Sequence, residues 1–299
     1  MAGIDMNRTT AGAPALLPRE ISNEIWSNTI EQSTVMTLSD RMDLPAGGKT
    51  IPIITGDPEA DWVAETEESP VGDSKLGSKN IRGYKLSVTE AFSNEFKRDL
   101  PGLYAELARR LPQALGKKFD QTVLHGTAPG TDFDVLSDIP VVTVDNADTA
   151  GDFQNAFTTV ALAGGDLSGW ALSPQAEAIA MGARNERGDY LFIPNAREGG
   201  QVGTIFGRPV HKSKGVYAPA TDSAAEILGV AGDFSSARVG IVSDISVSIS
   251  SEATINKGGV QLNLWQRGMF AIMAEFEVGY AIRDKAHFVR LGGTAATGA

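Results

Sequence analysis

Residues 47–50, Gly-Gly-Lys-Thr, match the end of a phosphate-binding loop. In such a loop, glycine amides surround a phosphate and the lysine neutralises its charge. The motif needs a further glycine five positions before Gly48, where this sequence has Asp43. The residues from Ile51 onward continue an extended pattern instead of starting the helix that the loop requires. The sequence therefore does not predict a nucleotide site here.

Other residues with catalytic or metal-binding chemistry are scattered singly. Ser168 lies between glycines but misses the spacing of a nucleophile elbow by one residue. The histidines at positions 125, 211 and 287 have no ligand spacing. Asp132 and Asp134 lie in a stretch with glycines that is typical of a solvated turn. Because no nucleophile is paired with a base, we expect no catalytic residues, no metal site and no cofactor.

The composition excludes several classes of protein. Of the 299 residues, 42% are hydrophobic and 21% are charged, which is ordinary for a folded soluble protein. The formal net charge of −11 argues against a duplex-binding protein, since phosphate contacts need Lys and Arg. The absence of cysteine excludes disulfides, thiol catalysis and thiolate zinc sites. No apolar run approaches the roughly 18 residues of a membrane span, and the N-terminus lacks a secretory pattern.

A charged hairpin is the most informative segment. Residues 62–65 predict a short strand, residues 66–79 are almost wholly polar, and residues 81–88 return with alternating apolar and polar side chains. An isolated two-stranded hairpin buries too little apolar area to offset its ordering entropy. We therefore expect a second copy of the chain to support it, unless it is a mobile surface loop. Its expected inter-subunit contact residues are Trp62, Glu65, Glu67, Glu68, Asp73, Lys75, Lys79, Arg82 and Lys85. The acidic outgoing limb and the basic tip and returning limb suit electrostatic docking.

The N-terminal residues predict an arm. Residues 1–17 are rich in Ala, Gly and Thr and predict an extended arm, and a short helix is predicted from Pro18 to about residue 31. Ile21, Ile25 and Trp26 lie on or beside one face of that helix. We expect these three side chains to contact a neighbouring subunit, because a segment of this composition becomes ordered only against a partner.

The strongest helix signal covers residues 100–125. Asp99 can cap the helix, Gly126 can end it, and Pro112 predicts a bend. Every fourth residue is apolar, and this stripe is expected to face the last strands of the chain; it consists of Leu103, Leu107, Leu111, Leu115, Phe119 and Val123. Further helices are predicted at residues 152–163 and 174–183. Strands are predicted at 35–44, 50–54, 170–172, 227–230 and 238–248, with a closing pair at 269–278 and 281–291, and residues 203–211 are predicted to be extended. The middle of the chain thus predicts an α+β domain with its own core.

The order of these elements resembles that of tailed-bacteriophage major capsid proteins, which share the Hong Kong 97-type shell fold. The resemblance extends over about residues 17–291. It is carried by Trp-Val-Ala-Glu at 62–65, the long helix ending at 119–126, Gly-Arg-Pro-Val at 207–210, Gly-Asp-Phe at 232–234 and the closing stretch at 266–291. No single motif is specific, and the order of the signals carries the inference.

The resemblance implies an α+β fold with a defined domain order. Residues 1–36 would be the N-terminal arm, 37–59 the strands that enter the peripheral domain, and 60–93 the extended loop. Residues 94–130 would be the peripheral domain with its long spine helix, 131–264 the axial α+β domain, and 265–299 the closing strands of the peripheral domain with the C-terminal tail.

The resemblance also implies a function. The chain would be a non-catalytic subunit of an icosahedral virion shell that encloses double-stranded DNA, assembled in the host cytoplasm from hexamers and pentamers of itself. A separate scaffolding protein is expected, because residues 1–36 leave no room for a scaffolding segment, together with a portal protein and optionally a decoration protein. Neither sequence-specific nucleic-acid binding nor membrane association is expected.

Two alternatives stay open at this point. An encapsulin-like nanocompartment subunit would share the fold, although the long polar arm before the first helix disfavours it. A hydrolase with the hairpin as its lid belongs to a different class, and it would need a nucleophile and base that the sequence does not show.

Overall fold

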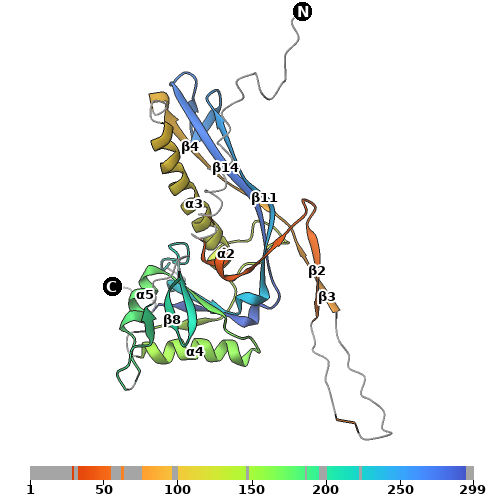
Figure 1. The fold of residues 1–299 in the computed structure, drawn as a ribbon, viewed down its shortest axis with the longest axis vertical. Coiled ribbons are helices and arrows are strands. Elements are labelled where there is room, and N and C mark those ends of the chain that lie inside the picture. Colours follow the sequence, from red (N-terminus) through yellow and green to blue (C-terminus); the bar gives the residue numbers. More distant parts are fainter. Residues whose placement is uncertain are drawn as a thin grey trace, which may run out of the picture.

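The computed structural model describes Thr29 and residues 33–54, 62–63, 76–95, 100–145, 148–185, 187–194, 201–221 and 224–293. Figure 1 shows an elongated upper part, a broader lower part and a two-stranded hairpin that projects to one side. The upper part contains the longest helix and the longest strands, because long amphipathic elements bury most apolar area when they lie side by side.

The upper part is built on a four-stranded sheet. Its strand order is β1 (Asp40–Asp43), β11 (Ala237–Ser250), β14 (Met269–Ile282) and β4 (Tyr84–Ser93). β1 is parallel to β11, and the other neighbouring pairs are antiparallel. Along β4, Tyr84, Leu86 and Val88 pack against the main core, whereas Lys85 is exposed. The period-two alternation of the sequence therefore marks the buried face of a sheet strand.

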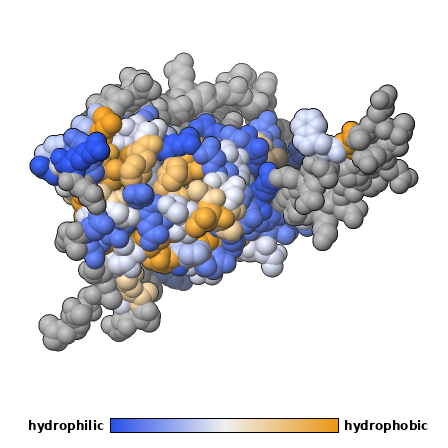
Figure 2. Space-filling model, turned by 90° about the horizontal axis from the view of Figure 1, so that it is seen from below, coloured by the Kyte–Doolittle hydropathy of each residue, from blue (hydrophilic) through white to orange (hydrophobic). Residues whose placement is uncertain are grey.

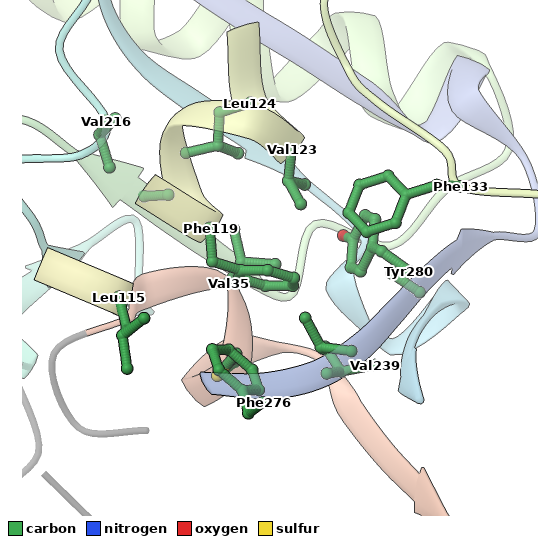
Figure 3. Packing of buried hydrophobic residues seen from close by; sticks show 14 of the residues in the cluster. Val35, Leu115, Phe119, Val123, Leu124, Phe133, Val216, Val239, Phe276 and Tyr280 are labelled. Carbon is green, nitrogen blue, oxygen red and sulfur yellow. The ribbon is translucent and has the colours of Figure 1, made fainter. Parts of the chain in front are cut away.

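The helix α3 (Leu100–His125) lies beside these strands and covers the predicted residues. Pro112 lies inside it without ending it, and the bend at this residue stays a prediction. Among the stripe residues whose side chains are described, all are buried: Leu107, Leu111, Leu115, Phe119 and Val123. Phe119 meets Tyr280 of β14 edge-on, with ring centroids 6.2 Å apart (Figure 3). The predicted packing of the stripe against the closing part of the chain is thus confirmed.

The lower part contains a seven-stranded sheet and two helices. The strand order is β5 (Val141–Thr143), β15 (Phe288–Gly292), β10 (Ile227–Gly232), β6 (Gly169–Leu172), β9 (Arg208–Lys212), β8 (Gln201–Ile205) and β7 (Phe192–Pro194). Asp148 caps α4 (Thr149–Leu162) and Ser173 caps α5 (Pro174–Gly182), each by accepting a bond from a first-turn amide. Phe153 and Trp170 centre a second apolar cluster. The lower part therefore has a core of its own, which also includes Val289 and Leu291 of β15, and the predicted bounds of the axial domain stay a prediction.

The remaining described elements are short. The projecting hairpin consists of β2 (Lys49–Ile54) and β3 (Leu76–Ile81), and a second hairpin of β12 (Thr254–Lys257) and β13 (Val260–Asn263). The helix α2 (Thr34–Leu38) precedes β1, and the 3₁₀ turns η2 (Phe234–Ser236) and η3 (Lys285–His287) precede β11 and β15.

The strand pairing of the projecting hairpin differs from the sequence prediction. The limbs are β2 and β3, paired from Lys49 with Ile81 to Ile54 with Leu76. The predicted outgoing strand at 62–65 is wrong at Trp62 and Val63, which are not in a strand, and its other residues lie outside the described ones. The predicted returning strand at 81–88 is mainly β4, which pairs with β14. The alternation of apolar and polar residues predicted β4 correctly, because one face of β4 is buried against the core. The strands β2 and β3 project from the body and have no buried face, so their sequences give no such signal.

Two further predictions need correction. The strand predicted at 35–44 is helix α2 followed by the shorter β1, because contacts from α3 stabilise a helix start at Ser33. The two closing segments are strands, but they do not lie in one sheet. β14 is in the four-stranded sheet, and β15 is in the seven-stranded sheet, where it pairs with β10 and β5. The chain therefore crosses between the two parts after β14.

Candidate assembly interfaces

The projecting hairpin is anchored at its base by a small apolar cluster. Ile81, at the end of β3, is 1% exposed and packs with Leu44 and Ala281. Ile51 of β2 is only partly buried against this cluster, and Thr50 donates a hydrogen bond to Asn80 across the two strands. Figure 1 shows β2 and β3 leaving the body of the molecule from this point. The apolar contacts of the described hairpin residues are therefore concentrated where it joins the body.

An ion pair reinforces the same base. The Nζ of Lys79 lies 2.5 Å from Oδ2 of Asp134 and donates a 2.6 Å hydrogen bond to the carbonyl of Ile282. The same Asp134 oxygen accepts a 2.7 Å bond from the amide of Ile282. Asp134 thus connects β3 to the end of β14, and it is more than the solvated turn residue expected from sequence. A lone Asp in a turn carries no sequence signal for this role, since its partners are distant in the chain.

Three other described residues were predicted to contact a neighbouring subunit through the loop, and they have different surroundings in the structure. Lys85 lies on β4 and pairs with Glu275 of the adjacent strand, with Nζ and Oε2 2.6 Å apart. Arg82 is exposed in the short link between β3 and β4. Trp62 is 99% exposed within this chain. The structure thus leaves Trp62 and Arg82 accessible, and it gives Lys79 and Lys85 carboxylate partners in their own chain.

Several predicted contact residues lie outside the described part of the chain. These are Glu65, Glu67, Glu68, Asp73 and Lys75 of the loop, and Ile21, Ile25 and Trp26 of the arm. Their contacts with a neighbouring subunit stay predictions.

The segment that follows the arm is tied to α3 by a buried carboxylate. Asp120 accepts hydrogen bonds from the Ser33 hydroxyl at 2.7 Å and from the amides of Thr34 and Val35. The Ser33 hydroxyl in turn accepts a bond from the Met36 amide. These bonds satisfy amides at the start of α2 that have no partner within the helix.

The environment of Asp120 is unusual for a carboxyl group. Its burial raises its pKa to about 6, although hydrogen bonds from Ser33 and Ser213 oppose the rise. Ser213 belongs to the segment after β9, so Asp120 connects α3 with both the N-terminal segment and the lower part. Sequence reasoning missed this residue. The available signal was its position next to Phe119 on the apolar stripe, where a charged side chain needs partners.

The lower part exposes apolar side chains that could meet another copy. Leu162 at the end of α4 is 85% exposed, and Ile193 of β7 is 62% exposed. Figure 2 shows apolar residues gathered among polar ones on the face seen from below. Gathered exposed apolar surface is typical of contact sites between proteins.

The described residues contain no site of two other classes. No group of three or more His, Cys, Asp or Glu in these residues has an arrangement that could hold a metal ion. No helix in the described part of the chain is long and apolar enough to cross a membrane.

Comparison with known proteins gives consistent matches over almost the whole chain. Curated relatives include the probable major capsid protein gp17 of Mycobacterium phage L5, which is 26% identical over 300 residues, covering 94% of this chain and 90% of the relative. Among solved structures, a chain of Mycobacterium phage Ogopogo aligns with a TM-score of 0.67 at 22% identity, covering 88% of this chain and 92% of that one. A chain of Gordonia phage Cozz aligns with a TM-score of 0.66 at 23% identity, covering 88% and 87%.

These structural matches confirm the predicted α+β fold of the Hong Kong 97 type. Residues 14–292 match the family described as the phage capsid family. The resemblance inferred from the order of sequence elements is thereby confirmed, and this chain belongs to the phage capsid family.

Proposed function

We propose that this chain is the major capsid protein of a tailed bacteriophage, a structural and non-catalytic subunit that self-assembles into the icosahedral head shell around double-stranded DNA. The observation that carries the proposal is the β2–β3 hairpin, which is fixed at its base by Ile81 and Lys79 but projects from the body of its own subunit. A hairpin of two strands gains too little from its own contacts to be stable alone. A neighbouring subunit supplies the missing surface.

The two sheets provide the domains of this subunit. The four-stranded sheet with α3 serves as the peripheral domain, and the seven-stranded sheet with α4 and α5 serves as the axial domain. The chain passes from the seven-stranded sheet to the four-stranded sheet between β10 and β11, and it returns between β14 and β15. These two crossings support a rigid connection between the domains. The exposed Leu162 and Ile193 support axial contacts within hexamers and pentamers.

The loop and the arm provide the remaining contacts between subunits. Trp62 and Arg82 are the described loop residues best placed for them, because both are exposed. Trp and Arg are also the residue types enriched at energetically important interface positions. Scaffolding and portal proteins are the expected partners in head assembly, which takes place in the host cytoplasm and yields a virion component.

Electron microscopy of the purified chain, alone and with a co-expressed scaffolding protein, tests the proposal. Closed shells of uniform size are expected. A variant in which a short Gly-Ser turn replaces residues 55–75 retains β2 and β3 and should fold without forming shells. The proposal is contradicted if the wild-type chain stays a monodisperse monomer at all concentrations under both conditions, or if the shortened variant forms normal shells.

A further inference from the structure

A cleft of about 490 Å³ lies between α3 and the segment at the end of β9. Arg110 and Lys117 line it from α3, and Lys212 and Lys214 line it from the opposite side. Neither the hairpin nor the exposed apolar surface of the lower part uses this cleft. It is therefore a separate feature of the boundary between the two parts of the molecule.

The cleft carries an excess of positive charge in an acidic protein. Lys212 is paired with Glu177, with Nζ and Oε2 2.8 Å apart, and Glu90 is a further carboxylate in the lining. Lys117 and Lys214 are exposed, and neither pairs with a carboxylate among the described residues. For a chain with a net charge of −11, this concentration of cations is a local exception. Clefts lined by one sign of charge focus the potential and attract counter-ions.

The two walls that carry these cations pack closely against each other. Arg110 and Lys117 are seven residues apart on α3, which is about two turns or roughly 10 Å along its axis. The opposite wall fits closely against α3, because a Cβ on Gly215 would lie 2.7 Å from the carbonyl oxygen of Lys117. Ser213, which is 8% exposed, also bonds to the buried Asp120. The cations therefore flank a trough on a rigid frame.

The ligand chemistry follows from the donors. Lysine is a strongly hydrated point charge that binds phosphate without demanding a particular orientation. Pro174, at the start of α5, also lines the cleft and brings the positive end of that helix dipole close to it. Positive charges on both sides of an open trough fit a chain of phosphates that runs along it. They provide no base-reading groups, so binding would be independent of sequence.

We infer that this cleft is a non-specific binding site for the phosphate backbone of duplex DNA. The inference rests on the proposed function, since a head shell places concentrated DNA next to every subunit. An acidic segment of a second copy is the competing occupant, and the test below separates the two. A site of this kind attaches DNA weakly at many repeated positions, while the acidic remainder of the chain limits adhesion elsewhere.

The test uses unassembled full-length chain, so that it is independent of shell formation. Binding to a fluorescent duplex is measured by anisotropy over a series of salt concentrations. The variant Lys117→Glu/Lys214→Glu should lower the slope of log affinity against log salt by about two, since each lysine neutralises about one phosphate. The matched control is Lys118→Glu/Arg267→Glu, which makes the same charge change at exposed positions outside the lining. It should retain the wild-type slope.

The neutral variant Lys117→Gln/Lys214→Gln keeps the test valid if the charge reversal impairs folding. It should lower the slope of log affinity against log salt by the same amount, about two. Equal slopes for the wild type, the cleft variants and the control would overturn the inference. Tighter binding of a polyglutamate peptide than of duplex at equal salt would also overturn it and assign the cleft to an acidic protein segment. Inorganic phosphate that binds in the cleft while duplex does not would overturn the DNA assignment. Loss of DNA binding alongside normal shells would leave the proposed function intact.

Discussion

The Ser33 hydroxyl donates a 2.7 Å hydrogen bond to Oδ1 of Asp120, which lies 87 residues later in the chain. The contact joins the segment after the N-terminal arm to the C-terminal part of the long helix. Both residues are buried, so the bond is not weakened by competition from water. Through Ser213, the same carboxyl group also contacts the lower part of the molecule. Asp120 is therefore a junction of three segments that are distant in sequence.

The first prediction concerns the pH dependence of this junction. Burial raises the pKa of Asp120 from 3.8 to about 6, so the folded state holds the proton more tightly than the unfolded state. The corresponding stability is fully present below about pH 4 and is lost as the pH rises through about 6. A shift of this size corresponds to about 3 kcal/mol of unfolding free energy. Denaturant unfolding measures the free energy of unfolding of the wild type and of Asp120→Asn from pH 3.5 to 8. The free energy should fall as the pH rises from about 4 through about 6 in the wild type, and this fall should be absent from Asp120→Asn.

The matched control for this experiment is Asp43→Asn, because Asp43 is exposed on β1. Its stability should follow the wild-type pH curve. Parallel curves for the wild type and Asp120→Asn would contradict the assignment of the pH dependence to Asp120.

The second prediction separates two basic residues of the loop set. Arg82→Glu should weaken shell assembly, more strongly at low salt, while the melting temperature of the unassembled subunit stays unchanged. Lys79→Glu should also lower subunit stability by roughly 1–3 kcal/mol, because it leaves Asp134 and the Ile282 carbonyl without their partner. Light scattering and thermal melts measure the two effects. Equal melting temperatures for both variants would contradict the distinction.

The third prediction concerns the buried stripe of α3. Leu107→Ala and Leu115→Ala should each lower the unfolding free energy by about 2–5 kcal/mol, since both side chains are 1% exposed and their loss leaves a cavity. Gln113→Ala, at an exposed position of the same helix, should change it by less than about 0.5 kcal/mol. Chemical denaturation measures these differences. Unchanged stability in both leucine variants would show that the stripe is not part of the core.

The fourth prediction concerns the N-terminal arm. Deletion of residues 2–17 should leave a soluble, folded subunit that assembles poorly or into less heat-resistant shells. These residues are rich in Ala, Gly and Thr and have few large apolar side chains that could fold against the subunit, whereas in a shell even a weak arm contact is repeated at every subunit. Electron microscopy and thermal melts of the shells provide the measurement. Shells of normal size and heat resistance would show that the arm is dispensable.

The sequence by itself determined the elements whose signals are local. The period-four stripe predicted α3 over residues 100–125, and Ser173 before Pro174 predicted the start of α5. In these cases propensity, capping and amphipathic spacing agree, so the chain specifies them without distant partners. The order of such elements also sufficed for the resemblance to phage capsids.

Only the tertiary structure decided which strands pair and which charged groups meet. The alternation at Tyr84 and Leu86 identified a strand with one covered face, but it could not show that its partner is β14 rather than the other limb of a hairpin. Likewise, Asp120 accepts hydrogen bonds from the first amides of α2 and so stabilises a helix where the sequence predicted a strand. Asp134 forms an ion pair with Lys79 that the sequence did not predict. Pairing and ion contacts depend on distances between residues far apart in the chain, and those distances are fixed only when the whole core has packed.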